Sequence, residues 1–229
     1  MGLFDFFKKP SAPEQAVPLS PDGPYQEGST NLIYHLLFCD KPDLYKASIQ
    51  PPYSYPFNLL FSGTSTAADL QQIIDDPAAD PRVKILGYNR QLATGYKPDK
   101  KELLAVIVEV GLNGGLDVLA SVSNGTARYI NQTGKILIWE TTDARVNEIT
   151  RELFLKSRQV IDQIGPWNKP RRSPPVTGNT RISFLVSDGL YFGEAPTDAL
   201  FSDPLAAPAL KHATQLMQYI TERSLQSQK

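Results

Sequence analysis

The sequence has few of the residues that make crosslinks or hold metals. Among 229 residues there is one cysteine, Cys39, and there are two histidines, His35 and His212. A single cysteine excludes an intramolecular disulfide, and the shortage of thiols and imidazoles excludes a cysteine-rich or histidine-rich metal site. We therefore expect no metal, and we expect Cys39 to be a small buried apolar residue.

The sequence also lacks the motifs that bind phosphates or carry nucleophiles. No glycine-rich run, including residues 111–115, fits the dinucleotide or nucleotide templates, and the G-x-S-x-G nucleophile motif is absent. We expect no cofactor. These absences favour a binding protein but leave open whether the chain is an enzyme.

There is no excess of positive charge, with 23 lysines and arginines against 24 acids and a net charge of −1. Proteins that grip phosphate backbones usually carry a basic excess, so we do not expect nucleic acid as a partner. Two short basic groups, one before the first predicted strand and one in a later proline-rich linker, are interpreted as solvated surface: Lys97, Lys100, Lys101, Lys169, Arg171 and Arg172.

No apolar run approaches the roughly 18 residues that span a bilayer, and the N-terminus does not resemble a secretory signal. The chain is therefore expected to be soluble and cytoplasmic, without a stable membrane anchor. Residues 1–28 contain five prolines between positions 10 and 24, which predicts an extended leader. Its apolar cluster at 3–7 either folds back onto the domain or makes a weak contact with a membrane surface or partner protein.

Residues 29–229 are predicted to form one α+β domain. Apolar periodicity and capping residues predict helices at 31–38, 43–48, 67–75, 81–95, 143–164 and 204–223. Alternating or continuous β-rich runs predict strands at 103–110, 116–122, 127–131, 135–140, 181–186 and 190–192. Loops this short join antiparallel strands, so we expect a four-stranded meander extended by a C-terminal hairpin.

The predicted sheet needs cover on both faces, because residues 103–110 read LLAVIVEV. The helices at 143–164 and 204–223 are expected to cover one face. The N-terminal helices form a cap or side layer, and either they or a second copy of the chain would cover the other face. A homodimer is therefore a hypothesis at this stage.

The best candidate for a site within the meander is an arginine. Asn124-Gly125 predicts a two-residue hairpin loop, which would place Ser121 opposite Arg128 on one face. Glu140, on the adjoining strand, would lie near them. Arg128 could bind a carboxylate or phosphate with two hydrogen bonds, or it could cover the sheet and pair with a local acid.

The second candidate is the unusual stretch 188–198, in which aromatic residues and two glycines precede two acids around a proline. It predicts either a rigid loop that presents Tyr191, Glu194 and Asp198 to a cationic partner, or a strand that leaves the sheet at Gly193 and reaches a helix. Exposed tyrosines of the other proline-rich loop, Tyr53 and Tyr55, could add to a binding patch.

A third candidate pair is His35 and Cys39, which would meet if both lay on one helix. A buried core histidine is the favoured interpretation, and a thiolate–imidazole pair is the alternative.

For function, the sequence favours a non-catalytic binding or protein-interaction domain. The alternative is a small enzyme or ligand-binding domain that uses Arg128, Glu140, Glu194 or Asp198 in one pocket. Since function resides in sites rather than folds, the architecture does not choose between them.

Overall fold

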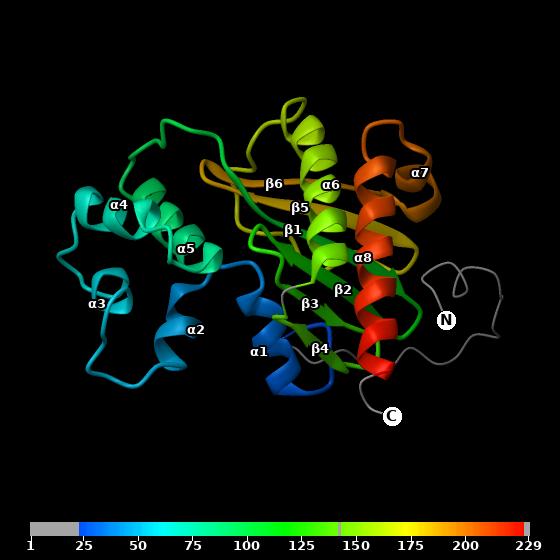
Figure 1. The fold of residues 1–229 in the computed structure, drawn as a ribbon, viewed down its shortest axis with the longest axis horizontal. Coiled ribbons are helices and arrows are strands. Elements are labelled where there is room, and N and C mark those ends of the chain that lie inside the picture. The colour runs from blue at the N-terminus through cyan, green and yellow to red at the C-terminus, as the bar shows by residue number, and fades with distance from the viewer. Residues whose placement is uncertain (1–22, 142, 227–229) are drawn as a thin grey trace.

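The computed structural model describes residues 23–141 and 143–226. The apolar cluster at 3–7 and most of the predicted leader lie outside the described residues. The described part folds as an α+β structure in which eight helices pack around one six-stranded antiparallel sheet (Figure 1). The α+β class and the antiparallel sheet are confirmed.

The sheet joins the N-terminal four strands and the C-terminal two in one layer. Its strands are β1 (Leu103–Leu112), β2 (Gly115–Val122), β3 (Ala127–Ile130), β4 (Ile136–Trp139), β5 (Asn179–Val186) and β6 (Gly189–Pro196). They lie in the order β4-β3-β2-β1-β5-β6, so β1 is central and β5 pairs with it. The last strand runs four residues further than the sequence predicts.

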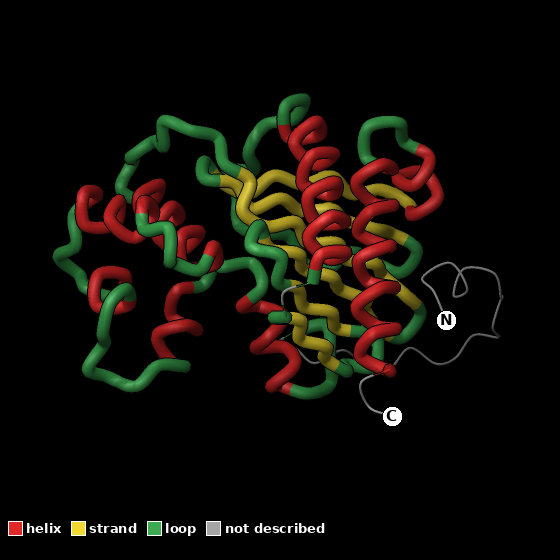
Figure 2. The backbone as a smooth tube through the Cα atoms, in the orientation of Figure 1, coloured by secondary structure: helices red, strands yellow, loops and turns green. Residues whose placement is uncertain are grey.

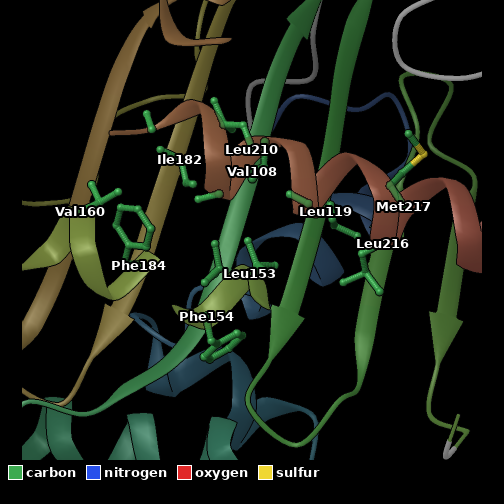
Figure 3. Packing of buried hydrophobic residues seen from close by; sticks show 14 of the residues in the cluster. Val108, Leu119, Leu153, Phe154, Val160, Ile182, Phe184, Leu210, Leu216 and Met217 are labelled. Carbon is green, nitrogen blue, oxygen red and sulfur yellow. The ribbon is translucent and has the colours of Figure 1, made fainter. Parts of the chain in front are cut away.

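One face of the sheet is covered by α6 (Ala144–Ile161) and α8 (Ala207–Gln226), as expected (Figure 1). Figure 3 shows Leu153 and Phe154 of α6 and Leu210 of α8 packed among strand residues such as Val108 and Phe184. Helix α6 is capped by Asp143, whose carboxylate accepts hydrogen bonds from two backbone N–H groups of the first turn. A short helix that the sequence analysis missed, α7 (Thr197–Ser202), precedes α8.

The other face is covered by the N-terminal segment. Helix α1 (Gly28–Leu36) lies behind the sheet, and α2 (Pro42–Ala47), α3 (Phe57–Leu60), α4 (Ala67–Asp75) and α5 (Pro81–Ala93) extend past its edge (Figures 1 and 2). Strand residues on this side, including Ile107 and Val118, are fully buried. The second face therefore needs no second copy of the chain to cover it. Among the described residues, no helix has both the length and the apolar character required to cross a membrane.

The entry into α1 is pinned to the sheet before the helix begins. The Asn31 side chain bonds both the N–H and the carbonyl of Tyr25, at 2.9 Å each, and the Tyr25 hydroxyl donates to the carbonyl of Leu116. The helix starts at Gly28, three residues ahead of the predicted range 31–38.

The hairpin between β2 and β3 differs from the prediction by one residue. Val122 bonds Thr126 across a three-residue loop in which Gly125 has a φ of +85°, and the Asn124 side chain accepts from the Thr126 N–H at 3.1 Å. One residue at positive φ after a turn gives a bulged loop rather than a two-residue one. Ala120 therefore opposes Arg128, so the predicted pairing of Ser121 with Arg128 is wrong and the two lie on opposite faces.

Candidate functional site

Three charged side chains form a row across neighbouring strands on the face that α1 covers. The strand register places Glu109 of β1 beside Arg181 of β5, and Arg181 beside Glu194 of β6. Arg181 lies 3.4 Å from Glu109 and donates to Glu194 from Nε and Nη2 at 2.9 and 2.7 Å. Glu109 is fully buried and Arg181 is 3% exposed, so this row is a charged element inside the fold.

Two segments form hydrogen bonds to the row, helix α1 and the proline-rich linker. The Tyr34 hydroxyl of α1 donates to Oε1 of Glu109 at 2.7 Å. Arg181 donates to the backbone carbonyls of Arg172 and Ser173, which lie in the proline-rich linker between α6 and β5. Buried charged groups are tolerated only when they are paired and hydrogen-bonded, and these contacts meet that requirement. The row therefore holds the end of α1 and the linker in fixed positions.

Burial controls the titration of this cluster. Burial raises the pKa of Glu109, although the nearby Arg181 and the hydrogen bond from Tyr34 act in the opposite direction. Burial, reinforced by the charge of Glu109, also raises the pKa of Tyr34, so the hydroxyl keeps its proton and remains a donor.

Above the row lies a cavity of about 690 Å³, between the end of α1 and linker residues 169–174. Among the described residues, four cationic side chains line it, Lys41, Lys169, Arg171 and Arg172, against one carboxylate, that of Asp40. We call it the cationic pocket. Its volume falls in the range of small-molecule sites, roughly 300–1,000 Å³.

Arg171 is the most strongly held of these cations. It donates to Asp40 at 2.7 Å, to the Tyr34 hydroxyl at 3.3 Å and to Nδ1 of His35 at 3.2 Å, and its guanidinium lies over the Phe38 ring. Because a guanidinium only donates, Nδ1 of His35 accepts this bond. Burial acts to lower the pKa of Arg171, but the hydrogen bond and charge of Asp40 outweigh it and raise the pKa, so the positive charge is retained.

The residues predicted from the sequence do not gather in one place. Arg128 lies on β3, and Glu140 directly follows β4. Their side chains pair at 2.5 Å near one edge of the sheet. Glu194 lies on β6, at the opposite edge. Three strands separate β3 from β6, which amounts to four inter-strand spacings of about 4.8 Å each. Arg128 and Glu194 thus do not open into one cleft.

The other two predicted residues point elsewhere. Tyr191 is buried on the opposite face from Glu194, where its hydroxyl donates to Asp188 at 2.8 Å and the ammonium of Lys101 lies over its ring. Asp198 is an exposed residue in the first turn of α7. Strand β6 passes through Gly193 and leads directly into α7, so the chain follows the strand-to-helix course.

The proposed helical pairing of His35 and Cys39 is wrong. Helix α1 ends at Leu36, and Cys39 has a φ of 52°, outside the helix. The buried thiol contacts the Tyr45 hydroxyl at 3.2 Å, while His35 contacts Arg171. Burial raises the pKa of Cys39 to about 12, which disfavours the reactive thiolate.

The aromatic residues of the two proposed loops pack separately. Tyr53 contacts Phe61 with ring centres 5.1 Å apart, and Phe192 makes a similar contact with Trp167. Tyr55 is 48% exposed and donates to Asp76. These contacts do not assemble a single aromatic patch from the two loops.

The central members of the site were not predicted from the sequence. Glu109 was included in an apolar run, and Arg171 was assigned to solvated surface, whereas its side chain is only 10% exposed. Arg172, at 54%, does face solvent. One signal was present: an acid in the middle of a central strand must find a cationic partner when that strand is buried. The sequence did not identify the partner, because Arg181 is 72 residues away.

Within residues 23–141 and 143–226, no group of three or more potential metal-ligating side chains is found. The sequence matches no family model, and no curated protein resembles it closely enough to count as a relative. Any assignment of function therefore rests on the site itself.

Proposed function

We propose that this chain is a non-catalytic binding domain whose cationic pocket recognises an anionic group. The observation that carries the proposal is the charge imbalance around a cavity of about 690 Å³, to whose walls the part of the chain that the structure describes contributes four cations and one carboxylate. The carboxylate of Asp40 is already paired with Arg171 at 2.7 Å. Lys41, Lys169 and Arg172 are exposed at the rim, where they can turn toward a ligand.

The rigidity of the pocket supports the same proposal. Arg171 is oriented by three side chains and the linker is anchored through Arg181, so this guanidinium and the linker backbone are held in place before a ligand arrives. A site that is ordered in advance loses less conformational entropy on binding. Arginine also matches the geometry of carboxylates and phosphates.

The alternative, a small enzyme or ligand-binding domain built on the predicted acids and Arg128, requires several of those residues in one pocket. Of them, Glu194 comes nearest to the cationic pocket, 3.7 Å from Arg172. The ligand-binding version of this alternative thus becomes the same as the proposed anion-binding function. Nothing favours the version in which these residues catalyse a reaction. A protein partner and a cytoplasmic location stay predictions.

The test is a titration of the full chain with inorganic phosphate, in which backbone amide chemical shifts are monitored by NMR. We expect saturable shifts in residues 34–41 and 169–174. Replacing two rim cations in one variant, Lys169→Ala with Arg172→Ala, should weaken binding by roughly tenfold or more, because hydrogen bonds to charged groups are strong.

The matched control removes two positive charges from exposed positions outside the pocket, Arg151→Ala with Lys211→Ala. It changes the net charge equally, so it separates a local site from general electrostatic attraction. Equal affinity in the two double variants, or shifts that never saturate, would overturn the proposal.

A further inference from the structure

A second, smaller cavity adjoins the cationic pocket. It has a volume of about 140 Å³, and its apolar wall is formed by Phe38, Ile85, Leu185, Val186 and Leu190. Its residues come from the segment just after α1, from α5, from the linker and from the hairpin of β5 and β6. We call it the apolar pocket.

The two pockets share part of their walls. Asp40, Arg171 and Leu190 line both of them. The Arg171–Asp40 ion pair therefore stands at the boundary, with cationic side chains on one side and aliphatic side chains on the other. An anion bound by Arg171 would lie directly beside an apolar space.

The size of the apolar pocket suggests what it holds. An engineered protein cavity of about 150 Å³, lined by leucine, isoleucine and phenylalanine, binds benzene. The apolar pocket is of similar volume and is lined by the same kinds of residue, with Asn89 as an additional polar member. The Asn89 amide already donates to the carbonyl of Cys39 at 2.8 Å.

From this arrangement we infer that the ligand is a small organic anion in which an acidic headgroup is joined to an apolar group about the size of a benzene ring. The headgroup occupies the cationic pocket and the ring occupies the apolar pocket. This inference rests on the proposed function, because it assumes that the cationic pocket binds an anion.

The experiment compares two probes with the same headgroup, methylphosphonate and phenylphosphonate, on the full chain. Phenylphosphonate should bind roughly tenfold or more tightly than methylphosphonate, since burial of an aromatic ring in an apolar site is favourable. In the wild-type protein, methyl signals of Ile85, Leu185 and Val186, which line the apolar pocket and not the cationic pocket, should shift with phenylphosphonate and stay in place with methylphosphonate.

A variant tests the location of the ring. Ile85→Phe adds volume at the wall of the apolar pocket, so it should abolish the advantage of phenylphosphonate and leave the affinity for methylphosphonate unchanged. Leu155→Phe is the control, because Leu155 is an exposed residue of α6 that lines neither pocket. Thermal unfolding verifies that each variant is folded. If Ile85→Phe does not fold, the methyl shifts of the wild-type protein decide whether the ring occupies the apolar pocket.

The outcomes separate the two claims. If both phosphonates bind with equal affinity, or if the methyl groups of the apolar pocket do not respond, this inference fails and the anion-binding function stands. If neither phosphonate binds, the proposed function fails as well.

Discussion

The guanidinium of Arg171 lies 3.8 Å from the centre of the Phe38 ring. This contact joins the proline-rich linker to the segment just after α1. The two residues are 133 positions apart in the sequence. A flat cation above an aromatic face is stabilising, and arginine combines this contact with directed hydrogen bonds. The contact accounts for the position of a linker that has little regular structure of its own.

Replacing Arg171 with lysine should show how much the stability of the fold depends on the planar shape of the guanidinium. Arg171→Lys keeps the charge but loses the planar contact and most of the bonds to Asp40, Tyr34 and His35. We expect a loss of about 2 kcal/mol in the free energy of unfolding, measured with urea. Lys169→Arg, a conservative change at an exposed neighbour, should have no measurable effect, and an equally small effect of Arg171→Lys would contradict this role.

The buried row should be sensitive to truncation. Glu109→Ala removes the acceptor of Tyr34 and one partner of Arg181, which leaves buried polar groups without bonds. Because Glu194 still pairs with Arg181, we expect the lower end of the usual range, about 3 kcal/mol of lost stability in denaturant unfolding. Glu148→Ala breaks an exposed ion pair with Arg145 and should cost no more than about 1 kcal/mol.

The pH dependence of stability should identify the titration of Glu109. Its pKa is raised by burial, so the folded chain holds this proton at pH values where the unfolded chain, with a pKa of about 4.3, has lost it. The contribution of the group to stability is thus complete below the unfolded pKa and is lost as the pH rises through the folded pKa.

Glu109→Gln removes this titration and retains an acceptor for Tyr34. The stability of the wild type relative to this variant should therefore decrease as the pH rises from the unfolded pKa of about 4.3 through the raised folded pKa, as measured by urea unfolding at several pH values. The pKa of Asp117 is also raised by burial. Because Asp117 is present in both proteins, its contribution cancels in the stability difference between them. A relative stability that increases with pH would show that Arg181 outweighs burial.

Gly111 should not tolerate a side chain. A Cβ atom there would lie 2.2 Å from the carbonyl oxygen of Val176, because the linker backbone crosses β1 at this point. Gly111→Ala should destabilise the protein by about 1–3 kcal/mol and displace the linker that forms the wall of the cationic pocket. Gly193→Ala is the control, since none of the described residues lies within 4 Å of the added atom. Equal thermal shifts in both variants would refute the close crossing.

The cap of α6 gives a prediction at acidic pH. Hydrogen bonds from the backbone of Val146, and from Tyr219 of α8, lower the pKa of Asp143. Asp143→Ala should cost about 1 kcal/mol at pH 7, and Asp143→Asn should cost less. The advantage of aspartate over asparagine is present above the unfolded pKa of about 3.9 and should disappear as the pH falls through the lower folded value. A constant difference down to pH 2 would argue against a charged cap.

The sequence predicted most of the secondary structure because the relevant signals are local. Thr66 caps α4 with Asp69 three residues later, Pro81 begins α5, and the continuous β-rich run of β1 extends to Leu112. The hairpin register was missed by one residue, because the Asn124 side chain favours a three-residue loop that the Asn-Gly pair alone does not reveal. That single shift moved Ser121 away from the face of Arg128.

The sequence by itself determined the α+β class, the antiparallel strands and the order of all strands and most helices, since apolar periodicity, caps and turn residues act over short distances. Only the tertiary structure decided the site. Glu109, Arg181 and Glu194 become neighbours through strand pairing, and Arg171 is brought to Tyr34 and Asp40 from far along the chain. Burial then forces these charges to pair with one another, and no local pattern records which partner each will find.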